Sequence, residues 1–141
     1  MNNLNKRFQA GRQYPGQQIG KSLEEVKADY ILQRKAYGQT LALNAGSNPD
    51  IDINLPKDGR MLLGISCYAA LTAATDNPTI DLEVNNTTFI NPLGIRAIQV
   101  DTLQDRMYYP LNLPLSGNDQ ISLDFAGVPA GLTVFMNFHY A

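Results

Sequence analysis

The segment TIDLEV, residues 79–84, alternates aliphatic and polar side chains at every position after the first. Successive side chains of a β-strand point to opposite faces, so this pattern predicts a strand with one buried face and one face in water. The segment QISLDF, residues 120–125, repeats the scheme with Ile121, Leu123 and Phe125 on the expected buried face. Both stretches indicate a sheet protein in which one side of each strand contributes to the core.

Further strands are expected on both sides of these stretches. DIDINL (50–55) alternates aliphatic and acidic or amide residues, TLALN (40–44) places two leucines on one face, and the long apolar stretch 61–71 suits a central strand. Turn signals separate these segments at 46–49, 57–59, 76–78, 85–88, 116–119 and 127–131. Seven to nine short strands at this spacing predict an all-β fold, a single β-sandwich with a jelly-roll or immunoglobulin-like topology.

The stretch GLTVFMNFHYA, residues 131–141, carries no formal charge and has apolar side chains on both faces. An exposed strand of this kind would promote aggregation, so we expect an interior strand whose second face is covered by a helix or by another subunit. Upstream, MYYPLNLPL (107–115) contains Pro110 and Pro114, which remove ladder donors and favour an edge strand or a surface loop. Tyr108 and Tyr109 in this segment are a candidate contact edge for protein or sugar.

At 141 residues the chain is long enough for one domain with its own core and an appendage. We expect an N-terminal arm at residues 1–37 and the sandwich at residues 38–141. Ser22 and Glu25 have the spacing of a capping box, which predicts a helix over about 22–37 that ends at Gly38. Its apolar stripe should pack on the chain's own sheet or on another subunit, and comprises Leu23, Val26, Tyr30 and Ile31.

Charge is divided unevenly along the chain. Residues 1–37 hold seven Lys and Arg and three acidic residues, whereas residues 38–141 hold four Lys and Arg and ten acidic residues. A basic arm before an acidic body suits contact with an acidic surface, either nucleic acid or a neighbouring identical subunit. The arm residues expected to bind a partner are Lys6, Arg7, Phe8, Arg12, Tyr14 and Lys21.

Residues that could support catalysis are few and scattered. His139 is the only histidine and has no recognisable nucleophile near it in the sequence, and Cys67 lies in an apolar strand where burial is expected. The acidic pairs in 50–52 and 81–83 belong to the solvent face of strands, and Asn85 with Asn86 suits a hairpin turn. No phosphate loop, zinc motif or calcium loop occurs. We therefore expect no catalytic, cofactor-binding or metal-binding residues and no enzyme activity.

The beginning of the sequence has no signal-peptide stretch, and no apolar stretch is long enough for a membrane span. The glycine-punctuated basic leader, the short helix and the strands DIDINL, TIDLEV, QISLDF and LTVFMNFHYA together resemble the small jelly-roll or β-sandwich structural proteins of bacteriophages, in particular capsid-associated proteins. The resemblance implies a non-enzymatic virion subunit, a decoration or minor capsid protein, made in the host cytoplasm. It also implies a homo-oligomer whose arm contacts neighbouring subunits or other virion proteins, without cofactor, membrane or small-molecule substrate.

Two other functions remain open from the residues alone. A carbohydrate-binding or other ligand-binding sandwich module would stack Tyr108, Tyr109 or Tyr140 on sugar rings. A nucleic-acid-binding protein would use the basic arm with its two aromatic residues, and its affinity would fall steeply with salt. The arm lacks the long arginine-rich run that genome packaging favours, so contact with protein is the preferred expectation.

Overall fold

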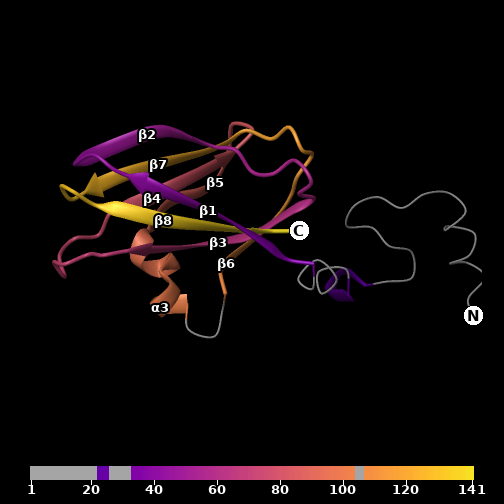
Figure 1. Ribbon diagram of the computed structural model, residues 1–141, viewed down its shortest axis with the longest axis horizontal. Helices are drawn as coiled ribbons and strands as arrows, with labels where there is room; N and C mark the ends of the chain where they lie inside the picture. Colours follow the sequence, from indigo (N-terminus) through magenta and orange to yellow (C-terminus); the bar gives the residue numbers. More distant parts are fainter. Residues whose placement is uncertain (1–21, 26–32, 104–106) are drawn as a thin grey trace, which may run out of the picture.

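Eight β-strands form two four-stranded antiparallel sheets in the computed structural model, which describes residues 22–25, 33–103 and 107–141 (Figure 1). Sheet A has the order β1 (Lys35–Ala42), β8 (Thr133–Tyr140), β3 (Met61–Ala69) and β6 (Tyr109–Pro114). Sheet B has the order β2 (Gly46–Ile53), β7 (Ile121–Val128), β4 (Thr79–Val84) and β5 (Thr87–Gly94). The predicted all-β sandwich is therefore confirmed.

The strand pairing identifies a jelly roll among the two expected topologies. β4 and β5 form a hairpin at the middle of the chain, and outward from it β3 pairs with β6, β2 with β7, and β1 with β8. The chain is thus one long antiparallel ribbon, rolled so that β8 also pairs with β3 and β7 with β4. Eight strands rolled in this way into two sheets are the jelly-roll architecture.

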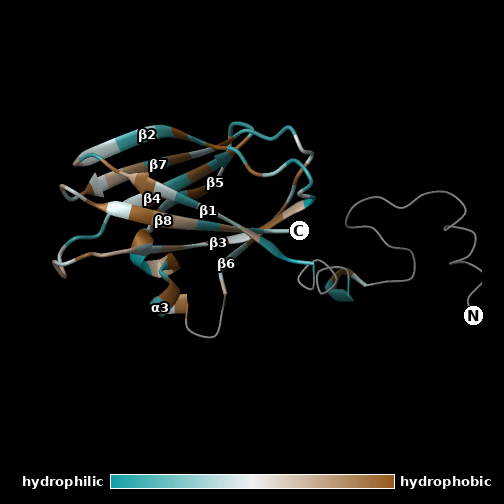
Figure 2. Ribbon diagram, in the orientation of Figure 1, coloured by the Kyte–Doolittle hydropathy of each residue, from teal (hydrophilic) through white to brown (hydrophobic). Residues whose placement is uncertain are grey.

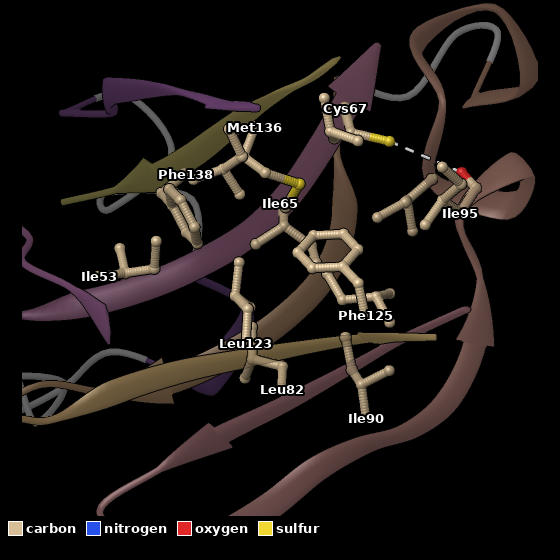
Figure 3. Packing of buried hydrophobic residues seen from close by; sticks show 14 of the residues in the cluster. Ile53, Ile65, Cys67, Leu82, Ile90, Ile95, Leu123, Phe125, Met136 and Phe138 are labelled. Atoms are coloured by element: carbon tan, nitrogen blue, oxygen red, sulfur yellow. Dashed lines mark hydrogen bonds between the residues drawn. The ribbon is translucent and has the colours of Figure 1, made fainter. Parts of the chain in front are cut away.

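The core lies between the two sheets and follows the alternation in the sequence (Figure 3). Its largest fully buried side chains include Phe125 and Leu123 from β7, and Phe138 and Met136 from β8. The polar residues between them point to the outer faces, and Figure 2 colours much of the edge strand β2 hydrophilic. Each strand therefore contributes one apolar face to the core, where burying a large apolar side chain stabilises the fold by about 1.5–3 kcal/mol.

The predictions for the interior and edge strands of sheet A are confirmed. β3 lies between β8 and β6, and β8 lies between β1 and β3, so both of these apolar strands are interior strands. β6, which contains Pro110 and Pro114, is an edge strand. Proline is tolerated there because the missing N–H on the outer side of an edge breaks no ladder.

The helix predicted over 22–37 is wrong at its C-terminal end. Residues 23–25 are helical, and the Glu25 N–H donates to Ser22 Oγ at 3.2 Å, as in a helix cap. Lys35–Ala42, however, form β1, so the sandwich starts at Lys35 and not at Gly38. Leu23 is 64% exposed and is not packed on either sheet, while Val26, Tyr30 and Ile31 lie outside the described residues.

Two turn predictions have different outcomes. Asn85 and Asn86 have φ of 51° and 64° and link β4 to β5 as a two-residue loop, which confirms the predicted hairpin turn. The turn expected at 46–49 is wrong, because these residues belong to β2, whose pairing with β7 shifts register near Asn48. A bulged edge strand and a turn share Gly, Asn and Pro, so the sequence signal is the same.

The connection from β5 to β6 contains a 3₁₀ helix, η1 (Ile95–Ile98), and a single helical turn, α3 (Val100–Leu103). Gln99, between them, forms a parallel bridge with Cys67. It therefore pairs with the edge of β3 just past the residues that pair with β6. The Arg96 guanidinium donates to the carbonyl oxygens of Asp76 and Ala73, each at 2.9 Å. In the described ranges, no helix has the length and apolar character needed to cross a membrane.

Candidate functional site

The four edge strands of the sandwich are protected to very different degrees. β2 contains Pro49 and two register shifts, β5 contains Pro92 and two shifts, and β6 contains two prolines and one shift. Prolines, bulges and short strands are the usual means by which sheet proteins prevent pairing with another chain. Three of the four edges thus carry such a feature.

β1 is the exception. All eight of its residues pair with β8 in unbroken register, from Lys35 opposite Tyr140 to Ala42 opposite Thr133, and it contains no proline. Its only charged residue, Lys35, is the first residue of the strand. The Lys35 Nζ forms an exposed ion pair with Asp58 Oδ2 at 2.5 Å. Among the described residues, nothing pairs with the outer side of β1. The strand is therefore a regular template on which a further strand could add.

Two exposed aromatic rings lie on the outer face of sheet A near this edge. Phe135 of β8 lies between Thr40 of β1 and Tyr68 of β3 in the register of the sheet. The Phe135 and Tyr68 rings are 46% and 51% exposed, with centroids 6.3 Å apart. We call this surface the open face, and it comprises Ala36, Gly38, Thr40, Ala42, Tyr68 and Phe135.

The expected cover for the second face of β8 is not found in the described part of the chain. Phe135 is nearly half exposed, and Leu23 of the N-terminal helix is itself exposed. The two expected covers are a helix of the same chain and another subunit. Residues 26–32 of the expected helix lie outside the described residues, and among the described residues nothing covers Phe135 fully.

The predicted tyrosine contact edge is divided by the fold. Tyr109 packs half-buried against the core, and Tyr140 is 5% exposed. Tyr108 stacks on the His139 ring with centroids 5.0 Å apart. Gly64 of β3 lies directly beneath this stack and makes room for the Tyr108 ring and the Tyr109 carbonyl group. The tyrosines therefore stabilise the junction of β3, β6 and β8, and leave no free row of rings for a sugar.

A serine and a histidine meet on the outer face of sheet A, which the sequence did not reveal. Ser66 Oγ lies 3.2 Å from His139 Nε2, within hydrogen-bond distance. Ser66 is only 1% exposed, and His139 Nδ1 is buried with no hydrogen-bond partner among the described residues. Burial, and secondarily the nearby Arg34 charge, lower the pKa of His139. A nucleophile must be reached by a substrate and its base oriented by a third group, so this pair suits packing rather than nucleophilic catalysis.

Cys67 has the buried role expected for it. Its side chain is fully buried, and the thiol donates a weak hydrogen bond to the Ile95 carbonyl oxygen at 3.6 Å (Figure 3). Burial, with a smaller contribution from the Asp101 charge, raises the pKa of this thiol to about 12. The cysteine is therefore protonated near neutral pH and packs as a small apolar residue.

Acidic residues gather on the outer face of sheet B. The strands of this sheet contain five acidic residues and no lysine or arginine, and we call this surface the acidic face: Asp50, Asp52, Asp81, Glu83 and Asp124. Asp81 lies directly opposite Asp124 in the pairing of β4 with β7. No group of three or more His, Cys, Asp or Glu in the described ranges has the geometry to hold a metal ion.

The arm residues predicted to bind a partner, which are Lys6, Arg7, Phe8, Arg12, Tyr14 and Lys21, lie outside the described residues. Comparison of the chain with models of known families, with curated proteins and with solved structures finds no match. The surfaces of the sandwich itself are therefore the basis for a functional proposal.

Proposed function

We propose that this protein is a non-enzymatic structural subunit of a large assembly, and that copies associate through β1 and the open face. The observation that carries the proposal is the contrast among the four edges, because only β1 lacks a feature that prevents strand addition. Strand addition gives main-chain hydrogen bonds, and the adjoining Phe135 and Tyr68 rings supply apolar area for contact.

A virion is the assembly that we propose. The resemblance to capsid-associated proteins of bacteriophages supports it, and jelly rolls recur among viral capsid domains, although they also occur in lectins. The tyrosines that a sugar-binding module would use are packed at the β3–β6–β8 junction or buried, and this favours the structural role over the carbohydrate-binding alternative.

The test is the mass of the full-length chain in solution, measured by light scattering over a range of concentration. We expect a defined multimer for the native sequence. A double variant with Gly38→Lys and Thr40→Lys should be monomeric, because lysines on an edge strand block strand addition. The Gly38 position can take a side chain, since an added Cβ would lie 3.6 Å from its nearest neighbour, Asn137 Oδ1.

A matched control distinguishes the effect of lysines on the β1 edge from the effect of added net charge. Thr72→Lys with Ala74→Lys adds the same two charges at exposed positions between β3 and β4, and should leave the multimer intact. Far-UV circular dichroism checks that each variant is folded. A native chain that stays monomeric at every concentration would overturn the proposal, as would a multimer that survives in the β1 variant.

A further inference from the structure

The acidic face of sheet B has an unusual charge arrangement. Asp81 and Asp124 lie directly opposite each other on adjacent interior strands, where like charges destabilise a sheet. Asp124 accepts a hydrogen bond from the Asp50 N–H at 2.6 Å, and no lysine or arginine of the described residues forms an ion pair with either aspartate. A positively charged partner would relieve this repulsion.

The same pair of aspartates lines a groove. It has a volume of about 380 Å³ and runs between the two edge strands of sheet B, with Pro49 of β2 on one side and Pro92 of β5 on the other. Thr79 and Ala126 line it together with the aspartates. Ser47, Asn91 and Phe125 complete the lining, and Phe125 is buried, so no long exposed side chain competes with an extended basic peptide for the two carboxylates.

The chain contains a segment of matching charge. Residues 1–21 hold four basic residues, Lys6, Arg7, Arg12 and Lys21, and no acidic residue. Fully extended, 21 residues span roughly 70 Å, more than twice the length of any strand in the sandwich. The acidic face and this leader are therefore complementary in charge, and the leader is long enough to bridge two molecules.

We propose that the groove on the acidic face binds the basic leader, residues 1–21, of a second copy of this chain. This inference rests on the proposed assembly function, since copies held together through β1 raise the local concentration of the leader. β1 starts at Lys35 in sheet A and runs toward the end of the sandwich where β2 begins (Figure 1). The groove lies in sheet B near that far end, at Ser47 and Pro49, whereas β1 of the same chain starts at the opposite end and in the other sheet.

Carbodiimide cross-linking of the full-length chain tests the partner. This reagent joins lysine amines to carboxylates in direct contact, so Lys6 or Lys21 should be linked to Asp81 or Asp124. Chains labelled with ¹⁴N and ¹⁵N are unfolded together in urea and refolded as a mixture at low salt, so that every multimer contains both. We expect linked peptides that combine both isotopes. Links confined to a single isotope would show that the leader folds back on its own chain, and links only to other acidic residues would show a different site; both overturn the proposal.

A binding measurement tests the groove independently of oligomeric state. The full-length chain is first made with its four leader bases changed to glutamine, so that its own leader does not compete. A fluorescent peptide of residues 1–21 should bind this protein at low salt, and binding should weaken as salt screens the charges. Asp81→Asn with Asp124→Asn should weaken binding by about tenfold or more.

The control removes two acidic residues outside sheet B, Asp76→Asn with Asp101→Asn, and should change the affinity by less than about twofold. Equal losses in both double variants would mean a general charge effect and would overturn the groove as the site. If the peptide does not bind while the native chain still forms a β1-dependent multimer, this inference fails and the proposed function stands. If the native chain is monomeric, the proposed function itself fails.

Discussion

Gly64 is the residue at which two strands of sheet A approach too closely for a side chain. A Cβ at this position would collide with the Tyr109 carbonyl oxygen and the Tyr108 ring. The backbone of Gly64 does not need a left-handed conformation, so the requirement for glycine here comes from space alone. The stack of Tyr108 on His139 depends on that space.

Gly64→Ala should therefore destabilise the fold by about 1–3 kcal/mol, because a backbone carbonyl cannot move aside as a flexible side chain can. Gly38→Ala, in the same sheet, is the matched control, since its Cβ would have an ordinary contact at 3.6 Å. Urea unfolding followed by circular dichroism measures both variants. Equal stability of the two would show that β6 adjusts freely around Gly64.

His139 should make the free energy of unfolding depend on pH. Burial and the Arg34 charge lower its pKa in the folded protein, so between the folded and unfolded pKa values the unfolded chain binds more protons. Stability should therefore be fully present above about pH 6.5 and should decline as the pH falls through the folded pKa. As the only histidine of the chain, it yields one imidazole C2–H resonance, whose titration by NMR gives the pKa directly.

The expected NMR midpoint lies below that of an exposed histidine. His139→Gln should remove this part of the decline in stability in acid while leaving the carboxylate titrations in place. A midpoint at or above the usual value would mean that the ring is more hydrated, or closer to negative charge, than its contact with Ser66 and Tyr108 implies.

At the scale of elements, the β4–β5 hairpin depends on two asparagines that do different work. Both have positive φ, but only Asn85 is hydrogen-bonded to the turn before β7: its side chain accepts from the Gln120 N–H and donates to Asp119, each at 2.9 Å. Asp119 also accepts hydrogen bonds from Ser116 and Gly117, so Asn85 connects two turns at one end of the sandwich.

Asn86→Ala should cost about 1 kcal/mol, the strain of a left-handed alanine. Asn85→Ala should cost about 2–3 kcal/mol, because two hydrogen bonds are lost in addition. Asn86→Gly should lie within about 0.5 kcal/mol of the native chain, since glycine adopts positive φ without strain. Thermal and urea unfolding rank the three variants, and an equal cost for the two alanines would show that the Asn85 hydrogen bonds contribute nothing.

The sequence predicts those strands whose pattern is visible locally, and misses those that depend on pairing with a distant strand. Alternation along β4 and β7 predicted both strands and their buried faces, because a half-buried strand needs only a period of two. β1 was partly mistaken for helix, since KAY at 35–37 has no strand signal of its own and becomes strand only by pairing with β8. β5 was not predicted as a strand because Asn91 and Pro92 interrupt its pattern.

The same distinction holds for the candidate surfaces. The acidic face was visible as alternation, and the apolar outer face of β8 was visible as a strand with two apolar sides. The unprotected edge of β1 was not visible in the sequence. Recognising it requires knowing that β1 lies at the edge of sheet A and that the other three edge strands contain prolines. The Ser66–His139 contact joins residues 73 positions apart, and no local pattern predicts such a contact.

At the scale of the whole molecule, the topology sets the folding rate. Only β4 and β5 are consecutive strands that pair, and every other pairing joins strands distant in sequence. Because such pairings require closing long loops before any contact is gained, refolding should take about milliseconds to seconds. Stopped-flow circular dichroism is a suitable probe, since the chain has no tryptophan. Refolding within microseconds would contradict this expectation.

β8 lies between β1 and β3, and Ala141 just beyond it exchanges backbone hydrogen bonds with Met61. During synthesis the ribosome delivers β1 and β3 long before β8, so until β8 has emerged β1 has no partner strand and β3 can pair only with β6. Sheet B, by contrast, has all its strands by Val128. In a growing chain, the edges of β1 and β3 that later pair with β8 would therefore remain unpaired until β8 is synthesised. Any helper protein that protects nascent chains should be needed during that interval and released once β8 closes the sheet.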